Sequence, residues 1–143
     1  MVLEALEGAA SVVAYNAGFE SGRLKDLARA VPSLSDALLH IAERLEDLLP
    51  IVRNHVYHPD FHGSFSLKKV APALLGEDAY QDLEIAEGQL ASVELHRLMF
   101  EKDEMDPEEW EALRRDLLAY CKEDTLLLVR LRRRLGELPF SDT

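Results

Sequence analysis

The sequence contains very little cysteine and no long apolar run. Cys121 is the single cysteine among 143 residues, so an internal disulfide is excluded and no cysteine framework can define the fold. No stretch approaches the ~20 consecutive apolar residues of a membrane-spanning helix, and residues 1–4 lack the basic start of a secretory signal. We therefore expect a cytoplasmic protein that has no membrane partner.

Positive charge is also scarce. The sequence contains 16 Lys and Arg residues and 27 Asp and Glu residues, which gives a formal net charge of −11. This balance excludes a protein that binds nucleic acid mainly through a basic surface, so any such contact must be local. A concentration of acidic side chains is, in contrast, what a magnesium or manganese site requires.

The chain has the length and composition of one globular domain over residues 1–143. Hydrophobic residues make up 48% of it, and neither an internal repeat nor a Gly/Ser linker divides it. Residues 11–15 are short, apolar and partly β-branched, as in a buried strand. Helical spacing of apolar residues predicts helices over residues 3–10, 17–31, 34–49, 66–76, 87–100 and 107–135.

Breaks in this pattern set the expected boundaries. A short strand is expected near Glu46, before Pro50, and a loop over residues 55–66. Asp106 should cap the last helix at its start and Gly136 at its end. The fold class that follows is helix-dominated α/β with few short strands, and all-α is the alternative.

Two carboxylates fall on apolar helix faces. Asp124 belongs to the stripe of the last helix, whose other members are Trp110, Leu113, Leu117, Tyr120, Leu127 and Leu131. Glu20 stands in line with Leu24, Leu27 and Val31 on its own helix. Buried acids are normally held by a basic partner, by backbone donors or by a metal ion. An ion pair explains either acid alone, but two such acids together favour a metal, because facing carboxylates repel unless a cation lies between them.

Three segments carry a resemblance to a known family. Residues 15–20 (YNAGFE) resemble the second motif of DnaQ-like 3′-to-5′ exonucleases: an aromatic or His, Asn, two residues, Phe and Asp. Residues 120–125 (YCKEDT) resemble their third motif, Y-x-x-x-D, of the tyrosine subclass. Residues 64–70 (SFSLKKV) resemble the segment ahead of the helix that precedes the third motif. The chain also resembles a bacterial domain-of-unknown-function family of this RNase H-like class, which shares a Tyr-His-Pro stretch like that at residues 57–59.

The resemblance implies the C-terminal part of an RNase H-like nuclease domain. In such a domain four carboxylates hold two Mg or Mn ions that flank the scissile phosphate of DNA or RNA. Glu20 and Asp124 would be two of these ligands, Tyr120 would orient the attacking water, and Asn16 and Lys68 would contact the substrate. The simpler alternatives are a core aromatic for Tyr120, a helix cap for Asn16 and a solvated side chain for Lys68.

Two departures from the family pattern limit the expected activity. The acid of the second motif is Glu20 and not Asp, which lengthens the ligand by one methylene. The first motif, Asp-x-Glu on a strand before Val12, is missing, and residues 82–84 (DLE) have its spacing but follow the second motif. We therefore expect this chain to be inactive or nearly so by itself. We also expect it to self-associate through the strand edge and the helix face that the first-motif strands would cover.

Other clusters have weaker interpretations. His55, His58 and His62 resemble a zinc cluster, but they lie in an expected loop without a nearby cysteine. The arginines at 130 and 132–134 form a basic helix end that complements the helix dipole. A different interpretation of the whole chain is a non-catalytic helical interaction module that retains nuclease-like motifs.

Overall fold

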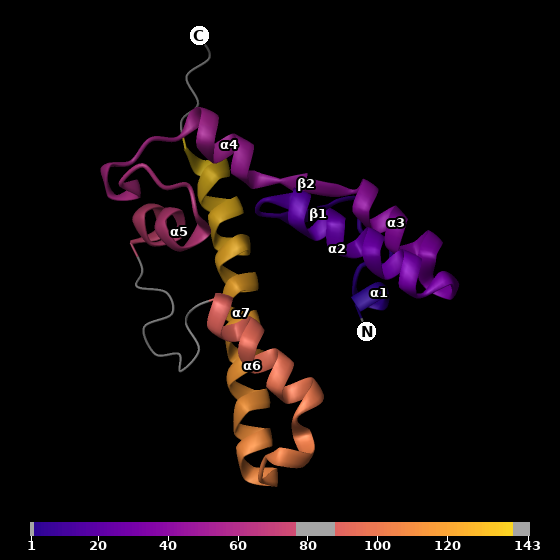
Figure 1. Ribbon diagram of the computed structural model, residues 1–143. Coiled ribbons are helices and arrows are strands. Elements are labelled where there is room, and N and C mark those ends of the chain that lie inside the picture. The colour runs from indigo at the N-terminus through magenta and orange to yellow at the C-terminus, as the bar shows by residue number, and fades with distance from the viewer. Residues whose placement is uncertain (1, 77–87, 139–143) are drawn as a thin grey trace. The chain divides into compact units, whose positions relative to one another are not determined.

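The computed structural model describes residues 2–76 and 88–138, with the side chain of residue 2 left out. The chain divides into two compact units, Met1–Val70 and Ala71–Thr143. The described residues form many helices and two short parallel strands (Figure 1), which confirms the helix-dominated α/β class. A single domain over residues 1–143 stays a prediction.

The first unit is built around a strand pair with helices between and after the strands. Its elements are α1 (Val2–Ala5), β1 (Val12–Ala14), α2 (Ala17–Ala30), η1 (Pro32–Leu34), α3 (Ser35–Glu43), β2 (Leu45–Asp47), α4 (Leu48–His55), η2 (Pro59–Phe61) and the start of α5 (Leu67–Leu75). The strands pair in parallel, with Val12 opposite Leu45 and Ala14 opposite Asp47. Since α2 packs against α3, the two helices between the strands form one connected layer.

Local sequence explains most of these boundaries. Val12 and Val13 are β-branched and favour the extended backbone of β1. Helix α2 ends before Pro32, as predicted, because proline has no backbone N–H to continue the helical hydrogen bonds. The strand expected near Glu46 is β2.

Two expected details of the first unit are wrong. The sequence predicts a helix over residues 3–10, but α1 covers only Val2–Ala5. A turn follows α1, with Gly8 at φ +75°. Pro50 does not end the preceding helical stretch, because it lies in the first turn of α4. Its missing N–H costs nothing there, since the first amide groups of a helix have no partner within it.

The core of the first unit is apolar and distributed over most of its elements. Its buried side chains are Ala14, Ala28, Leu38, Ile41, Leu48, Val52, Phe61 and Val70. The phenol of Tyr15, directly after β1, donates a 2.6 Å hydrogen bond from Oη to the carbonyl oxygen of Phe65. This bond ties the loop before α5 to the end of the strand.

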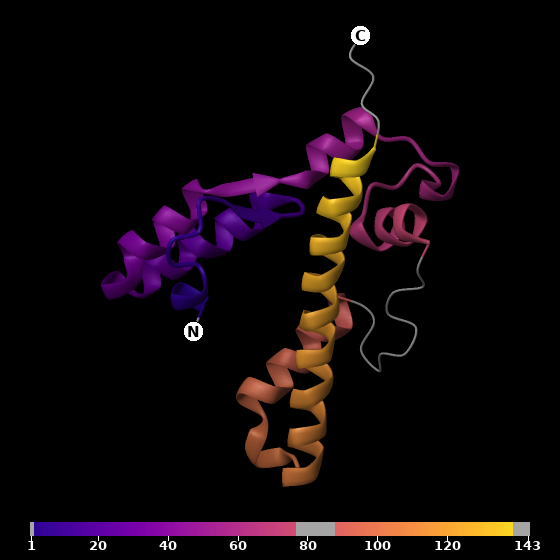
Figure 2. The ribbon, with the colours of Figure 1, turned by 180° about the vertical axis from the view of Figure 1, so that it is seen from behind.

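The second unit is a helical hairpin. Helix α6 (Gly88–Phe100) packs against the first half of α7 (Pro107–Glu137), and η3 (Lys102–Glu104) lies between them (Figures 1 and 2). Ala91 and Leu117 form the centre of the contact, with Leu98, Leu113 and Tyr120 packed around them. The expected stripe on α7 is confirmed: Leu117, Leu127 and Leu131 are buried, and Trp110, Leu113, Tyr120 and Asp124 are half-buried.

The face of α7 around Trp110, expected to be incompletely covered, is occupied by α6 and η3. The indole Nε1 of Trp110 donates a 3.2 Å hydrogen bond to the carbonyl oxygen of Leu98, and Lys102 Nζ lies 4.7 Å from the centre of its ring. Exposed apolar side chains lie on both helices: Leu90, Val93, Leu95, Met99 and Phe100 on α6, and Leu118 and Val129 on α7.

The ends of α7 differ from the prediction. Gly136 lies inside the helix, because the helix continues past the buried Leu135 and stops only at Glu137. Asp106 occupies the N-cap position, but its side chain makes no capping hydrogen bond. Residues 82–84 lie outside the described residues. No helix in the described part of the chain combines the length and apolar character needed to span a membrane.

Candidate functional site

The start of α2 lies at the carboxyl end of the strand pair. Asn16, between β1 and α2, has a left-handed backbone with φ 68° and ψ 52°, which Asn tolerates better than most residues. Its side chain makes no capping hydrogen bond, so the expected capping role of the Asn16 side chain is wrong. The Asn16 side chain is exposed, and its contact with substrate stays a prediction.

Asp47 performs the capping instead, and for two helices. Its Oδ1 accepts from the N–H of Asn16 at 2.8 Å and from the N–H of Leu49 at 3.0 Å, and its Oδ2 accepts from the N–H of Ala17 at 3.0 Å. One carboxylate thus holds the first turns of α2 and α4 together at the end of β2. The sequence prediction missed Asp47, although an Asp shortly before a proline is a recognisable N-cap signal.

Glu20 lies in the first turns of α2 and is half-buried. Its Oε2 atom is shielded from solvent and has no hydrogen-bond partner among the described residues. The nearest arginine along the chain, Arg23, pairs instead with Asp26 at 2.8 Å. Among the described residues, therefore, no basic side chain is hydrogen-bonded to this oxygen, and the ion-pair alternative for Glu20 stays a prediction. Leaving a carboxylate oxygen in this state costs roughly 1–3 kcal/mol.

Tyr120 and Asp124 are one turn apart on α7 and interact directly. Burial, followed by the charge of Asp124 and a hydrogen bond to Asp124, raises the pKa of Tyr120 to about 12. The phenol therefore keeps its proton at neutral pH and donates to the carboxylate. A Cβ at Gly88 would lie 3.4 Å from Tyr120 Oη, so the start of α6 limits the space around the hydroxyl.

A groove of about 440 Å³ lies beside Tyr120 in the second unit. It is mostly apolar, and Arg114 is its one charged lining residue among those described. The walls come from α6 and α7: Gly88, Ala91, Ser92, Leu95, Leu98, Leu117, Leu118 and Cys121 complete the lining. Tyr120 thus connects the apolar groove to the carboxylate of Asp124.

The two predicted ligands belong to different units. Glu20 lies in the first unit and Asp124 in the second, and a shared cleft for both stays a prediction. The parts of the chain that the structure describes contain no group of three or more His, Cys, Asp or Glu able to hold a metal ion. The three loop histidines therefore do not form a zinc cluster: His58 Nδ1 accepts instead from the N–H of Asp60 at 3.3 Å. Lys68 is half-buried in the first turn of α5, and its contact with substrate stays a prediction.

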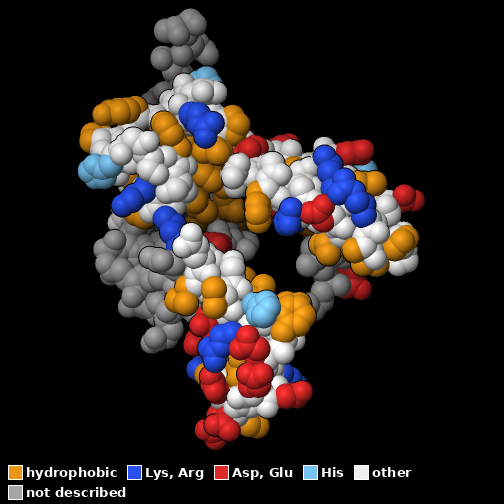
Figure 3. All heavy atoms as spheres, viewed as in Figure 1, with side chains coloured by type: hydrophobic (Ala, Val, Ile, Leu, Met, Phe, Trp, Pro, Cys, Tyr) orange, Lys and Arg blue, Asp and Glu red, His pale blue; other side chains and the backbone are white. Residues whose placement is uncertain are grey.

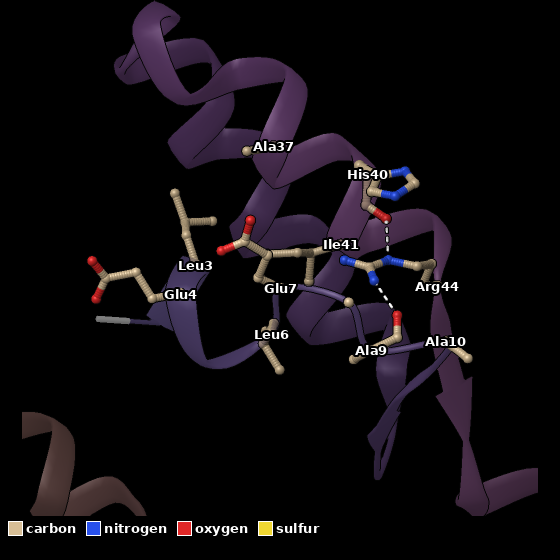
Figure 4. Close-up of a pocket in the computed structure, with 11 residues that line it drawn as sticks. Leu3, Glu4, Leu6, Glu7, Ala9, Ala10, Ala37, His40, Ile41 and Arg44 are labelled. Atoms are coloured by element: carbon tan, nitrogen blue, oxygen red, sulfur yellow. Dashed lines mark hydrogen bonds between the residues drawn. The ribbon is translucent and has the colours of Figure 1, made fainter.

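A second groove, of about 660 Å³, lies between α1 and α3 and was not expected from the sequence (Figure 4). Arg44 closes one end of it, donating to the carbonyl oxygen of Ala9 and, at 3.3 Å, to that of His40. Val12 N–H donates to the carbonyl oxygen of Arg44 at 2.9 Å. These contacts fix the chain as it enters β1, so we assign Arg44 a structural role.

Comparison with known proteins identifies one region of the chain. The model of a family described as Domain of unknown function (DUF2779) matches residues 1–66, which include Asn16, Glu20 and residues 57–59 but not Tyr120 or Asp124. No curated protein and no solved structure matches the chain. The matched region is less than half of the 143 residues and covers most of the first unit. Residues 1–66 therefore carry a DUF2779 domain, a domain of unknown function.

Proposed function

We propose that this chain contributes two metal ligands, Glu20 and Asp124, to a nuclease that hydrolyses phosphodiester bonds of DNA or RNA with magnesium or manganese. The observation that carries the proposal is the Oε2 atom of Glu20, which is buried without a hydrogen-bond partner among the described residues. A buried carboxylate oxygen normally has a donor, a basic partner or a cation. Among the described residues neither a donor nor a basic side chain is hydrogen-bonded to this atom, which supports a cation as its partner.

The Tyr120–Asp124 pair supports the same chemistry. Divalent ions held by carboxylates stabilise the charge that develops on a phosphate and activate the attacking water. Tyr120 stays protonated and hydrogen-bonded to Asp124, which fixes the rotamer of the acid before a ligand arrives. In the proposed function the same hydroxyl orients the attacking water, and Asn16 and Lys68 contact the nucleic-acid backbone.

The number of ligands sets the expected activity. A two-ion site needs more carboxylate oxygens than Glu20 and Asp124 supply, and the resemblance to DnaQ-like exonucleases assigns the others to an Asp-x-Glu segment. With these two ligands alone we expect one weakly held ion and little or no hydrolysis.

A non-catalytic helical interaction module is the second candidate function. The exposed apolar side chains of α6, among them Val93, Met99 and Phe100, favour it because large exposed apolar patches commonly mark contact surfaces. Metal binding discriminates between the nuclease and the interaction module, since a non-catalytic module does not require a cation at Glu20.

The test is a manganese titration followed by NMR. Paramagnetic Mn²⁺ should broaden the amide signals around Glu20 and those around Asp124 over the same concentration range. Glu20→Gln and Asp124→Asn should each remove both effects, whereas the matched controls Glu46→Gln and Glu123→Gln should leave them unchanged. Broadening at only one of the two acids, or at different manganese concentrations, would contradict a shared site.

A further inference from the structure

The loop between α4 and α5 holds an aromatic side chain in solvent. Tyr57 is 87% exposed, far more than Ile51, the next large hydrophobic of this part of the chain, at 39%. The loop runs outward between the two helices in both ribbon views (Figures 1 and 2). A Tyr side chain that is almost fully exposed adds little to the apolar core and is accessible to a binding partner.

The loop itself is firmly anchored. Val56 and His58 have extended backbones, with φ −124° and −144°, so Tyr57 between them points away from their half-buried side chains. The His58 ring lies 5.9 Å from that of Phe61, which is only 2% exposed and is 6.0 Å from the Phe65 ring. Tyr57 is thus presented to solvent by a loop that is packed on both sides of it.

The charge around this loop is opposite to that of the whole chain. Asp60 is the single acidic residue in residues 48–76, against the basic residues Arg53, Lys68 and Lys69 and three of the five histidines. The net formal charge of the whole chain is −11. Figure 3 shows blue and pale-blue side chains on the surface around α4 and α5, at the upper left of the view. A locally basic segment of an acidic protein attracts an anionic partner.

We propose that the segment of residues 48–76 binds single-stranded nucleic acid through the ring of Tyr57 and the exposed cations Arg53 and Lys69. The Tyr57 ring would stack on an unpaired base, and the two cations would neutralise phosphates. Base–aromatic stacking requires a base face, which a duplex does not offer along its length. A bilayer is the poorer match, because interfacial binding needs a broader apolar surface than one ring. The inference takes its ligand class from the proposed function, but it involves no metal ion.

Substitutions at Tyr57 test the stacking. In EDTA and low salt, fluorescence anisotropy with a short labelled oligothymidine should show that Tyr57→Ala weakens binding about fivefold or more. Tyr57→Trp should keep or strengthen binding, and Tyr57→Leu should weaken it as Ala does. The Leu variant separates stacking from general apolar contact, since a peptide or membrane site would tolerate it. None of these changes should alter the fold, because the side chain is almost fully exposed.

Substitutions of the cations test the electrostatic part. Arg53→Gln and Lys69→Gln should each lower the slope of log Kd against log salt concentration by about 0.7, the value for one phosphate contact on a single strand. Lys25→Gln, an exposed lysine of α2 in the same unit, is the control and should leave the slope unchanged.

Three outcomes would overturn the inference. These are equal binding by Tyr57→Leu and the wild type, equal affinity for duplex and single strand, and binding to anionic vesicles without binding to oligothymidine. Strand binding in EDTA together with an absent manganese effect at Glu20 would contradict only the proposed function. Manganese binding without strand binding would contradict only this inference.

Discussion

The Oδ1 atom of Asp47 accepts a 2.8 Å hydrogen bond from the backbone N–H of Asn16. The bond joins the carboxyl ends of two parallel strands, because Asn16 follows β1 and Asp47 ends β2. The Asp47 carboxylate also accepts hydrogen bonds from the N–H groups of Ala17 and Leu49. Helix α2, which carries Glu20, is therefore positioned by a side chain from the second strand.

Asp47→Ala should destabilise the protein by about 2–3 kcal/mol, because it removes the caps of α2 and α4 in one step. Urea denaturation followed by circular dichroism measures the change. Glu46→Ala, an exposed side chain on the same strand, is the control and should change the stability by no more than about 0.5 kcal/mol. Equal midpoints for the two variants would show that the caps are energetically unimportant.

Glu20→Gln should raise the melting temperature in EDTA. In the proposed function manganese binds and stabilises the wild type, and Glu20→Gln should remove that effect. The neutral amide relieves the cost of a buried carboxylate oxygen without a hydrogen-bond partner, by about 1 kcal/mol. Glu43→Gln, on the exposed surface of α3, should change neither property. A lower melting temperature for Glu20→Gln in EDTA would mean that the carboxylate has a stabilising role in the absence of metal.

Two tyrosines of the described residues have a raised pKa and should make the protein sensitive to alkali. The pKa values of Tyr15 and Tyr120 are raised to about 12, in each case first by burial, from an ordinary value near 10. The fold therefore favours the protonated phenols. This contribution to stability is complete below pH 10 and is lost as the pH rises from about 10 through 12. Tyr15→Phe and Tyr120→Phe should each flatten this decline, measured by urea denaturation at several pH values, and a decline unchanged in both variants would contradict the assignment.

In a protein that also carries an Asp-x-Glu segment, Asp124→Asn should abolish metal-dependent cleavage of labelled single-stranded DNA or RNA while the fold remains intact. Removing one charge from an acidic site relieves repulsion and so does not destabilise the apo state. Tyr120→Phe should slow cleavage and leave the manganese effect at Asp124 in place. Cleavage that survives Asp124→Asn would show that the site lies elsewhere.

Self-association should depend on α6. Val93 and Phe100 are 57% and 69% exposed, and their burial between two copies would remove apolar surface from water. Analytical ultracentrifugation should show that the wild type associates and that Val93→Ser combined with Phe100→Ser reduces this association. Leu27→Ser, an exposed apolar residue of α2, is the control and should leave the association unchanged. A wild type that is monomeric at high concentration would contradict the prediction.

The main elements and the apolar stripe of α7 could be predicted from the sequence, but the apolar face expected on α2 is wrong, because Leu27 and Val31 are exposed. The helices over residues 17–31, 87–100 and 107–135 and the strands near Val12 and Glu46 were all predictable, because the spacing of apolar residues and the positions of proline are local properties of the chain. The same spacing placed Asp124 on the buried stripe of α7. The end at Gly136 was not predictable, since the burial of Leu135 overrides the tendency of glycine to end a helix.

How these elements are joined at the candidate site could be seen only in the folded chain. Three features join residues far apart in the chain: the parallel register of β1 and β2, the capping by Asp47 at the start of α2, and the hydrogen bond from Tyr15 to the carbonyl oxygen of Phe65. Such contacts depend on packing, and they produce no periodic pattern of residues in the sequence. The same is true of Glu20: its spacing predicted an apolar face, but the lack of any donor for its Oε2 among the described residues is a property of the folded surroundings.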